Sequence, residues 1–544
     1  MFLPSAFIFR LAFFFFEPVA LSHLFPTFRK YTSPTAFFFF TYRLYFLFVC
    51  FFFFFIFIAL RIVFTATSYT MTATDYDVIV VGAGMFGSSA AKHLRRLQPS
   101  LRVAVIGPDN NSGRLARGQH FDEARICRRV ETAVPWAHLN DLGALSYRET
   151  EATSGVSFYT PCGCMWVGTA EDRDASMECM DSVQRASGGA DAVTYAVVCE
   201  EGDAGAAAAA AATAAGKTSV LRVTASSSVA EGVFGGEIRV GQLADAADGV
   251  ETYYIAESGA AGGGTVHPTQ YVKAQLACAA AVSPASNFCH LLEVVLQIAC
   301  VAAGEGGDDC VYAVKTDAEH TYTAGRVLVA TASFTKYHKL LPESVTDRLK
   351  PLAADVVLLR LVPPHGDDHE ANVKASELCP SMIKTTGKND DERIYTLPPR
   401  YYAEHAGWYV KMGRAGGPAA AVRDVERHTL AAAMAWYDTG KEVPKTDPCV
   451  THLANMLQDI FPRWPVAPDT PEQSNRETVR CIVDETKEDV PMLDCVDGKG
   501  LFCAIAGNGR GAKTCDPIGC IAAHRVLGKE LPPAYSFAKD AFRL

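Results

Sequence analysis

The clearest pattern of apolar and polar positions lies near residue 80. Val78–Val81 is a short run of β-branched residues, which is typical of a strand buried on both faces. Ser88–Leu97 has the spacing of a helix, and Val103–Ile106 is a second strand of the buried type that ends at Gly107. The pattern predicts a strand, a turn, a helix and a second strand within about thirty residues.

Further elements follow from apolar runs in the rest of the chain. We expect helices at 267–281 and 291–303, alternating strands within 311–331, aromatic strands lining a cavity at 394–413, and a buried strand at 501–506. Residues 200–265 instead contain the low-complexity runs GDAGAAAAAAATAAGK and ESGAAGGGT. We interpret this stretch as surface insertions or partly ordered loops that carry no chemistry.

The first 70 residues differ in composition from everything that follows. Leu44–Leu60 is a run of 17 uncharged residues between Arg43 and Arg61, and apolar residues follow again at 62–64. It reaches the lower length limit for crossing a hydrocarbon core of about 30 Å. A transmembrane helix at 44–64 is therefore one interpretation, and the basic residues before it would then keep the N-terminus cytoplasmic.

The alternative is that translation starts at Met71, only six residues before the first predicted strand. Phe, Leu, Ser and Pro share pyrimidine-rich codons, so a non-coding tract translated in frame would have this composition. A signal peptide is disfavoured, because the long apolar run lies far from Met1. A membrane is a partner only if residues 44–64 are really translated.

The charge and the cysteine content limit which partners and metal sites we expect. The chain has 50 basic and 60 acidic residues and a formal net charge of −10, which argues against nucleic acid as a partner. Its 17 cysteines include no CxxC pair, and Cys162 and Cys164 form only a C-x-C. We expect no metal site, and reduced thiols of the kind found in intracellular proteins.

A glycine-rich turn lies between the first strand and the helix. Its residues are Gly82, Ala83, Gly84, Met85, Phe86 and Gly87. Gly82 permits the tight turn, Gly84 lets the backbone approach a pyrophosphate, and Gly87 lets the helix pack close to the strand. Amides at the start of the helix would face the anion. Inside a strand–helix–strand unit, the turn predicts dinucleotide binding.

The second strand departs from the usual dinucleotide pattern. An acidic residue normally ends this strand and binds the ribose hydroxyls, but Gly107 occupies that position. Either Asp109 reaches back to the ribose, or backbone and water bind it.

Five segments in order resemble the sarcosine oxidase branch of the D-amino-acid-oxidase-like FAD-dependent oxidoreductases. All five follow the glycine turn: RGQHFDEARICRR (117–129), YTAGRVLVATASFTKYHKLLP (322–342), WYVKMG (408–413), RCIVDETKEDVPMLD (480–494) and AIAGNGRGAKTCDPIG (504–519). The resemblance implies an α/β fold with a doubly wound, Rossmann-type FAD domain and an interleaved antiparallel-sheet substrate domain. It covers residues 75–530, interrupted at 200–265 and followed by a tail at 531–544.

The resemblance also implies chemistry: oxidation of the C–N bond of a small carboxylated secondary amine to an imine, with molecular oxygen reduced to hydrogen peroxide. Arg128 and Lys513 match the two positions that hold the substrate carboxylate in this family. Arg128 could instead be a surface charge within its basic cluster.

Other residues are expected at the flavin ring on the same basis. Lys411 matches the lysine that helps oxygen accept electrons, although strand alternation also permits a solvent-facing lysine. Cys481 matches the cysteine that carries FAD covalently, or it is a small apolar filler. Further positions implied to contact FAD are Arg125, Gly509 and Gly511. Arg510 replaces the family's histidine, a change expected to alter the electrostatics at the flavin.

Two other functions stay open. A dehydrogenase that passes electrons to a protein or quinone would suit a membrane-anchored chain. A catalytically degenerate flavin-binding protein would explain Gly107, Arg510 and a C-terminal glycine turn one residue shorter than in the family. The last three residues, Phe-Arg-Leu, match a peroxisomal tripeptide only in part, so the expected location is a membrane, the cytoplasm or a peroxisome-like organelle.

Overall fold

A computed structural model describes residues 74–109, 122–189, 191–243, 251–303, 310–386, 393–414, 431, 455–457, 460–470 and 474–544. The alternatives for the first 70 residues, including a membrane span at 44–64, lie outside these ranges. Within them, no helix combines the length and the apolar character needed to cross a bilayer.

An eight-stranded sheet contains the predicted strand–helix–strand unit. Its order is β10-β2-β1-β13-β12-β11, with β21 also paired to β13 and β20 paired to β21. The strands are β1 (Tyr76–Val81), β2 (Val103–Ile106), β10 (Phe288–Leu291), β11 (Val295–Ala303), β12 (Cys310–Thr316), β13 (Thr321–Val329), β20 (Met492–Cys495) and β21 (Leu501–Ile505). The pairs among β10, β2, β1, β13 and β21 are parallel. This parallel core confirms the predicted Rossmann-type arrangement.

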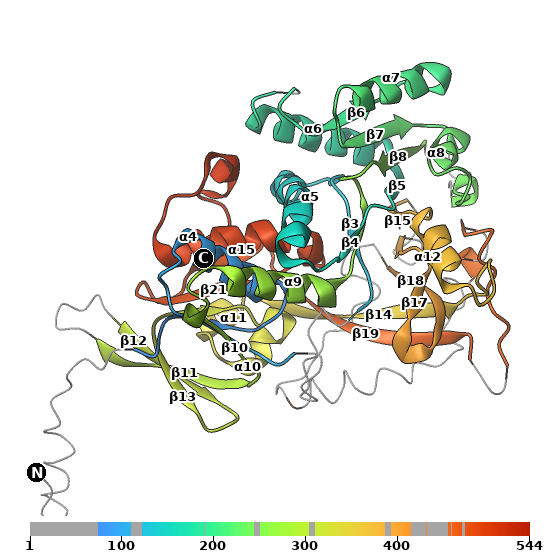
Figure 1. Cartoon of the computed structure of the whole chain (residues 1–544). Helices are drawn as coiled ribbons and strands as arrows, with labels where there is room; N and C mark the ends of the chain where they lie inside the picture. The colour runs from blue at the N-terminus through green and yellow to red at the C-terminus, as the bar shows by residue number, and fades with distance from the viewer. Residues whose placement is uncertain are drawn as a thin grey trace, which may run out of the picture. The chain divides into compact units, whose positions relative to one another are not determined.

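Helix α4 (Met85–Leu97) contacts both α9 (Pro268–Ala281) and α15 (Gly511–Leu527) along this sheet (Figure 1). Val80, Val105 and Leu328 of the sheet pack with Ala90 and Leu94 of α4 in one buried cluster. α4 and α15 approach very closely: a Cβ atom added to Gly519 would lie 2.5 Å from the Cβ of Ser89. Only a glycine permits that approach.

A second, ten-stranded sheet has the order β19-β14-β18-β16-β15-β5-β8-β7-β6, with β17 paired to β18. The strands are β5 (Cys164–Thr169), β6 (Tyr195–Val198), β7 (Ser219–Thr224), β8 (Thr252–Ser258), β14 (Lys350–Arg360), β15 (Ser381–Lys384), β16 (Ile394–Thr396), β17 (Arg400–Tyr402), β18 (Gly407–Arg414) and β19 (Arg476–Glu485). Most of its pairs are antiparallel, which agrees with the predicted substrate domain.

The remaining elements connect and cover these sheets. A small sheet of order β3-β9-β4 joins β3 (Arg125–Cys127), β4 (Tyr159–Thr160) and β9 (Gly264–Val266). The other helices are α5 (Val134–Ser154), α6 (Ala170–Ala186), α7 (Gly202–Ala214), α8 (Ser227–Val233), α10 (Thr335–His338), α11 (Glu343–Thr346) and α12 (His369–Glu377). Figure 1 shows α6 and α7 beside β6 and β7, and α12 beside β17 and β18.

Two sequence-based expectations about local structure are wrong. The stretch at 291–303 was expected to be helical, but it forms β11, paired antiparallel with β12. Its β-branched and apolar residues suit a strand, and the partner strand decides the outcome. Residues 200–265 are also more ordered than expected: α7 is a largely exposed helix, whereas β7 and β8 belong to the ten-stranded sheet.

The thiol expectation needs a correction as well. Cys300 of β11 and Cys310 of β12 form a disulfide across adjacent strands. Cys162 and Cys164 are free and buried. Among the described residues, no group of three or more His, Cys, Asp or Glu side chains is placed to hold a metal ion.

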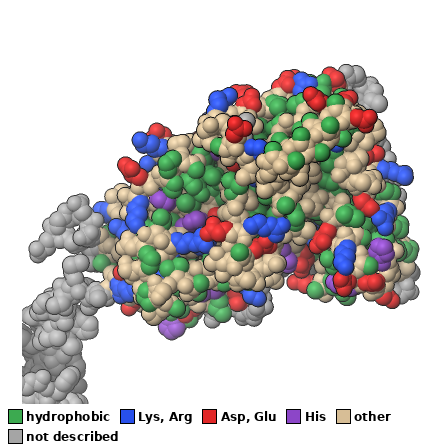
Figure 2. Space-filling view, turned by 45° about the horizontal axis from the view of Figure 1, so that its top comes forward, with side chains coloured by type: hydrophobic (Ala, Val, Ile, Leu, Met, Phe, Trp, Pro, Cys, Tyr) green, Lys and Arg blue, Asp and Glu red, His purple; other side chains and the backbone are tan. Residues whose placement is uncertain are grey.

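The surface of the described part carries both signs of charge. Acidic and basic side chains are interspersed over the face that Figure 2 shows. Of the large apolar side chains that are exposed, Leu296 and Val301 lie on β11, at one end of the eight-stranded sheet.

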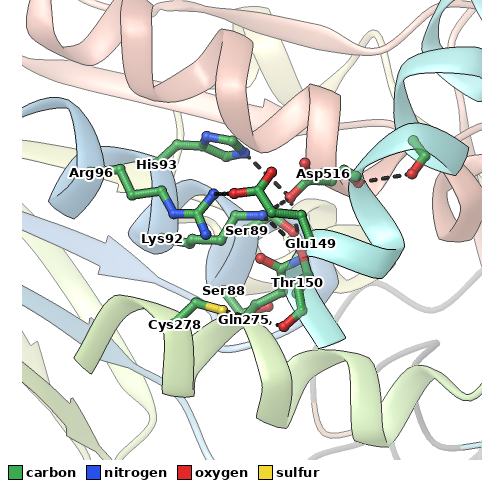
Figure 3. Close-up of polar contacts among 12 residues, drawn as sticks. Ser88, Ser89, Lys92, His93, Arg96, Glu149, Thr150, Gln275, Cys278 and Asp516 are labelled. Atoms are coloured by element: carbon green, nitrogen blue, oxygen red, sulfur yellow. Dashed lines mark hydrogen bonds and ion pairs between the residues drawn. The ribbon is translucent and has the colours of Figure 1, made fainter. Parts of the chain in front are cut away.

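A buried ionic network joins α4 to α15 (Figure 3). The ammonium group of Lys92 pairs with the carboxylate of Asp516, and both side chains are almost fully buried. His93 Nε2 lies 3.3 Å, and Gln275 Nε2 3.2 Å, from the same carboxylate oxygen. Burial alone would raise the pKa of Asp516, but His93 and Lys92 hold that pKa well below its usual range. The carboxylate therefore stays ionised and anchors side chains from three helices.

We expect Asp516→Asn to lower the free energy of unfolding by about 3–5 kcal/mol, because it leaves a buried ammonium group without an opposite charge. Urea denaturation of the holoenzyme measures the change. Asp540→Asn, at an exposed position, is the matched control and should stay within about 0.5 kcal/mol of the parent. Equal effects of the two substitutions would show that the network contributes nothing specific.

Candidate functional site

The glycine turn leaves no room for larger residues at two of its positions. Gly82 directly follows β1 and has a φ of 106°, and a Cβ there would lie 2.4 Å from the carbonyl oxygen of Ala330. A Cβ on Gly87 would lie 1.9 Å from the carbonyl oxygen of Gly82. Position 82 thus needs glycine for its backbone conformation, and position 87 needs glycine so that the helix can pack closely on the strand.

The N-terminus of α4 is suited to an anion. The helix begins at Met85 after Gly84, with no capping side chain and no acidic residue in its first turn. Amides at a helix N-terminus lack partners within the helix and carry partial positive charge. Backbone groups of the turn can therefore surround a pyrophosphate, so these residues fit the phosphate groups of a dinucleotide.

The second glycine turn lies directly beside the first. A Cβ on Gly511 would lie 3.1 Å from Cζ of Phe86. The turn is held by Asp484, whose carboxylate accepts a hydrogen bond of 2.9 Å from the amide of Ala506. Gly509 has a φ of 68°, in the left-handed region that favours glycine. Segments more than 400 residues apart in sequence thus form one glycine-lined wall.

Lys411 lies in a buried charged cluster. Its ammonium group, on β18, pairs with the carboxylate of Asp122, and Arg125 of β3 pairs with the same carboxylate. The hydroxyl of Tyr402 lies 3.4 Å from the other oxygen of Asp122. Lys411 is only 4% exposed, which excludes the solvent-facing alternative. Asp122 offsets part of the positive charge and fixes the direction of both cations.

Arg128 and Lys513 lie in a second buried cluster, around Glu131. Arg128 is 8% exposed, so it is not a surface charge, and its Nη2 lies 3.0 Å from the carboxylate of Glu131. Arg510 Nε lies 3.7 Å from the same oxygen. Burial would raise the pKa of Glu131, but Arg128, Lys513 and Arg510 hold it below its usual range. One carboxylate is therefore surrounded by three basic side chains.

Lys513 has an unusual protonation equilibrium. It belongs to the first turn of α15, where the hydroxyl of Tyr147 donates a hydrogen bond of 2.9 Å to its carbonyl oxygen. Burial lowers the pKa of its ammonium group, Arg128 lowers it further and Glu131 opposes both, with a result of about 7. A small change in local charge can therefore switch Lys513 between its two forms.

The two clusters are connected through one segment. Arg125 and Arg128 are three residues apart, so about 10 Å of extended backbone separates their Cα atoms. Arg125 begins β3, which pairs with β9, and Arg128 directly follows that strand. The structure brings Arg128 together with Lys513, and Arg125 together with Lys411, in two neighbouring groups.

A cavity of about 250 Å³ lies close to these clusters but is lined by other residues. Glu123, His267, Arg400, Tyr401 and Trp408 are among the residues that line it. Because side chains alternate along a strand, Trp408 and Lys411 leave β18 on opposite faces. The aromatic strands at 394–413 do line a cavity, as expected, but it lies on the face of β18 that Lys411 does not use.

Sequence reasoning assigned no role to Asp122 or Glu131. Asp122 stands in the quoted segment before Arg125, and Glu131 follows directly after that segment. A buried cluster of several cations requires a carboxylate nearby, which was the available signal. The side chain of Cys481 lies outside the described part, so the covalent link stays a prediction.

Comparison with known proteins agrees with this geometry. The family model described as FAD dependent oxidoreductase matches residues 77–525. The match covers most of the chain, which therefore belongs to the FAD-dependent oxidoreductase family, within the D-amino-acid-oxidase-like superfamily. No curated protein matches the chain at a significant level.

Solved structures share the fold at low sequence identity. A thermally stable mutant of fructosyl peptide oxidase has a TM-score of 0.55 at 15% identity, covering 86% of this chain and 93% of that one. Amadoriase I from Aspergillus fumigatus, a fructosyl amine:oxygen oxidoreductase, has a TM-score of 0.52 at 16% identity, covering 87% and 90%. Glycine oxidase from Geobacillus kaustophilus has a TM-score of 0.51 at 15% identity, covering 86% and 98%.

We expect Gly87→Ala to raise the dissociation constant for FAD by at least about tenfold, since the new methyl group would displace the turn from the phosphates. Titration of apoprotein with FAD, followed by flavin fluorescence, measures this. Gly232→Ala is the control, because a Cβ at that exposed position meets no atom within 4 Å. An unchanged dissociation constant for FAD in Gly87→Ala would show that the phosphates of FAD do not bind at this turn.

Proposed function

We propose that this protein is an oxidase of small carboxylated secondary amines, such as N-methyl, cyclic or sugar-modified amino acids. The carbon next to nitrogen loses a hydride and the nitrogen loses a proton, which leaves an imine that water hydrolyses. Bound FAD would accept the hydride, and its two electrons, with two protons, would reduce oxygen to hydrogen peroxide.

The observation that carries this proposal is the excess positive charge buried around Glu131. Arg510 is held more closely by Asp489, at 2.5 Å, so Arg128 and Lys513 share the single carboxylate of Glu131. With Lys513 protonated, the cluster therefore favours one further anion. Arg128 offers a planar guanidinium that suits a carboxylate, and Lys513 adds a point charge at the N-terminus of α15. A substrate carboxylate held there would be oriented by Arg128, which follows β3, and by Lys513 of α15, two positions far apart in the family domain.

The same cations affect the nitrogen of the substrate. Positive charge close to an amine disfavours its ammonium form. A substrate anchored by its carboxylate would therefore bind more readily with a neutral nitrogen, from which hydride loss at the adjacent carbon is easier. Arg128 and Lys513 thus serve both binding and orientation.

Lys411 has the second role in the proposal. Its ammonium group is buried and oriented by Asp122, and Arg125 adds positive charge beside it. A fixed cation stabilises negative charge that develops on oxygen during its reduction. Covalent attachment of FAD through Cys481, which lies in β19, is a further part of the proposal and is supported by the resemblance of the 480–494 segment.

We expect the KM for a carboxylated amine to rise as the pH increases through about 7, the pKa of Lys513. The ammonium form below this pH attracts the carboxylate, and the neutral form above it does not. Steady-state kinetics from pH 6 to 9 test this, with the corresponding decarboxylated amine as the control substrate. Lys513→Met should raise the KM and abolish its pH dependence, and the same pH dependence with both substrates would contradict the assignment.

We expect Lys411→Met to slow reoxidation of the reduced enzyme by oxygen about 10²–10³-fold, because a preorganised charge is lost. Anaerobic reduction by substrate should change much less. Stopped-flow absorbance separates the two half-reactions, and Lys374→Met, an exposed lysine on α12, is the control.

The parent enzyme should form one hydrogen peroxide per amine consumed. Amine oxidation without peroxide, coupled instead to an added quinone or protein acceptor, would favour the dehydrogenase alternative. Failure of every amine to reduce the flavin would favour a catalytically degenerate protein.

A further inference from the structure

In this structure the position directly after β2, Gly107, has no room for an acidic side chain. A Cβ on Gly107 would lie 2.5 Å from the backbone nitrogen of Ala83, inside the glycine turn. Any side chain at this position would displace the loop that surrounds the phosphates. The ribose hydroxyls of the adenosine half of a dinucleotide, usually bound from this position, therefore need other partners.

His290 lies beside Gly107. It belongs to β10, which runs parallel to β2 with His290 opposite Val105 and Leu291 opposite Ile106. Its Nε2 is 2.9 Å from the carbonyl oxygen of Gly107. A carbonyl oxygen only accepts, so Nε2 carries the hydrogen. In the neutral ring, Nδ1 is then a hydrogen-bond acceptor.

The surroundings favour that neutral ring. Burial lowers the pKa of His290 below its usual range, while the bond to Gly107 and the charge of Asp109 only partly oppose this. His290 is half-buried, as is Asp109. The end of β2 therefore has a neutral imidazole and a nearby carboxylate, both able to accept hydrogen bonds from hydroxyl groups.

Topology places these groups where a dinucleotide would pass. β1, β2 and β10 are parallel neighbours, so their carboxyl ends lie on one edge of the sheet. The glycine turn starts at that edge, directly after β1. In open α/β sheets, ligands bind outside the carboxyl ends of the strands. The amide of Gly82 also donates a hydrogen bond of 2.8 Å to the carbonyl oxygen of Ile106, which ties the turn to the end of β2.

We propose that His290, together with Asp109, binds the ribose hydroxyls of the adenosine half of FAD in place of the usual acidic residue at the end of β2. His290 accepts through Nδ1, while its Nε2–H bond to Gly107 fixes the ring. The inference rests on membership of the FAD-dependent family and is independent of the amine substrate.

The test uses two ligands and apoprotein of the full chain in a Cys481→Ser background, which removes any covalent link. The ligands are FAD and an FAD analogue whose adenosine ribose lacks both hydroxyls. Dissociation constants are measured by flavin fluorescence, without substrate. His290→Phe keeps the ring volume but removes the acceptor, and it should raise the dissociation constant for FAD about tenfold while changing that for the analogue less than about twofold.

Two further variants complete the experiment. His290→Gln keeps a donor and an acceptor and should restore much of the affinity for FAD. His320→Phe, at an exposed histidine, is the matched control and should change neither constant. An equal loss of affinity for both ligands in His290→Phe, or no loss for either, would overturn the proposal. Because no turnover is measured, failure of the proposed amine oxidation would leave this result unaffected.

Discussion

The close crossing of α4 and α15 is the constraint on which the rest of the described structure depends. Gly519 lies against the backbone of Ser89 and Ala90 at distances that exclude a side chain. The Lys92–Asp516 pair holds the same two helices together at a buried position. Since each helix begins at a glycine-rich turn, this crossing places both turns, and both positive helix ends, on one side of the sheet.

Burial of so many cations is possible because two carboxylates accompany them. Asp122 compensates Lys411 and Arg125, and Glu131 compensates part of the charge of Arg128, Arg510 and Lys513. Isolated buried charges would be very costly, whereas the carboxylates in these clusters offset part of that cost. Arg510 is shared between Glu131 and Asp489, whose carboxylate lies 2.5 Å from its Nη1.

One strand of the second sheet borders two different chemical environments. Strand β18 presents Lys411 to one face and Trp408 to the other, so one strand borders both a charged cluster and an aromatic-walled cavity. Residues 122 and 123 also differ in this way: Asp122 pairs with Lys411, whereas Glu123 lines the cavity. Because neighbouring side chains on extended backbone point to opposite faces, a few residues are enough to keep the charged cluster and the cavity apart.

The sequence by itself determined the parallel nucleotide-binding core, because β1, β2 and the glycine turn are specified by local apolar runs and by positions that only glycine can occupy. Through the resemblance of their segments to a known family, it also identified Arg128, Lys411 and Lys513 as candidates. Only the tertiary structure decided that 291–303 is a strand, that β7 and β8 join the large sheet, and which carboxylates accompany the cations. Those outcomes depend on partners distant in the sequence, which supply the hydrogen bonds and opposite charges that local patterns do not contain.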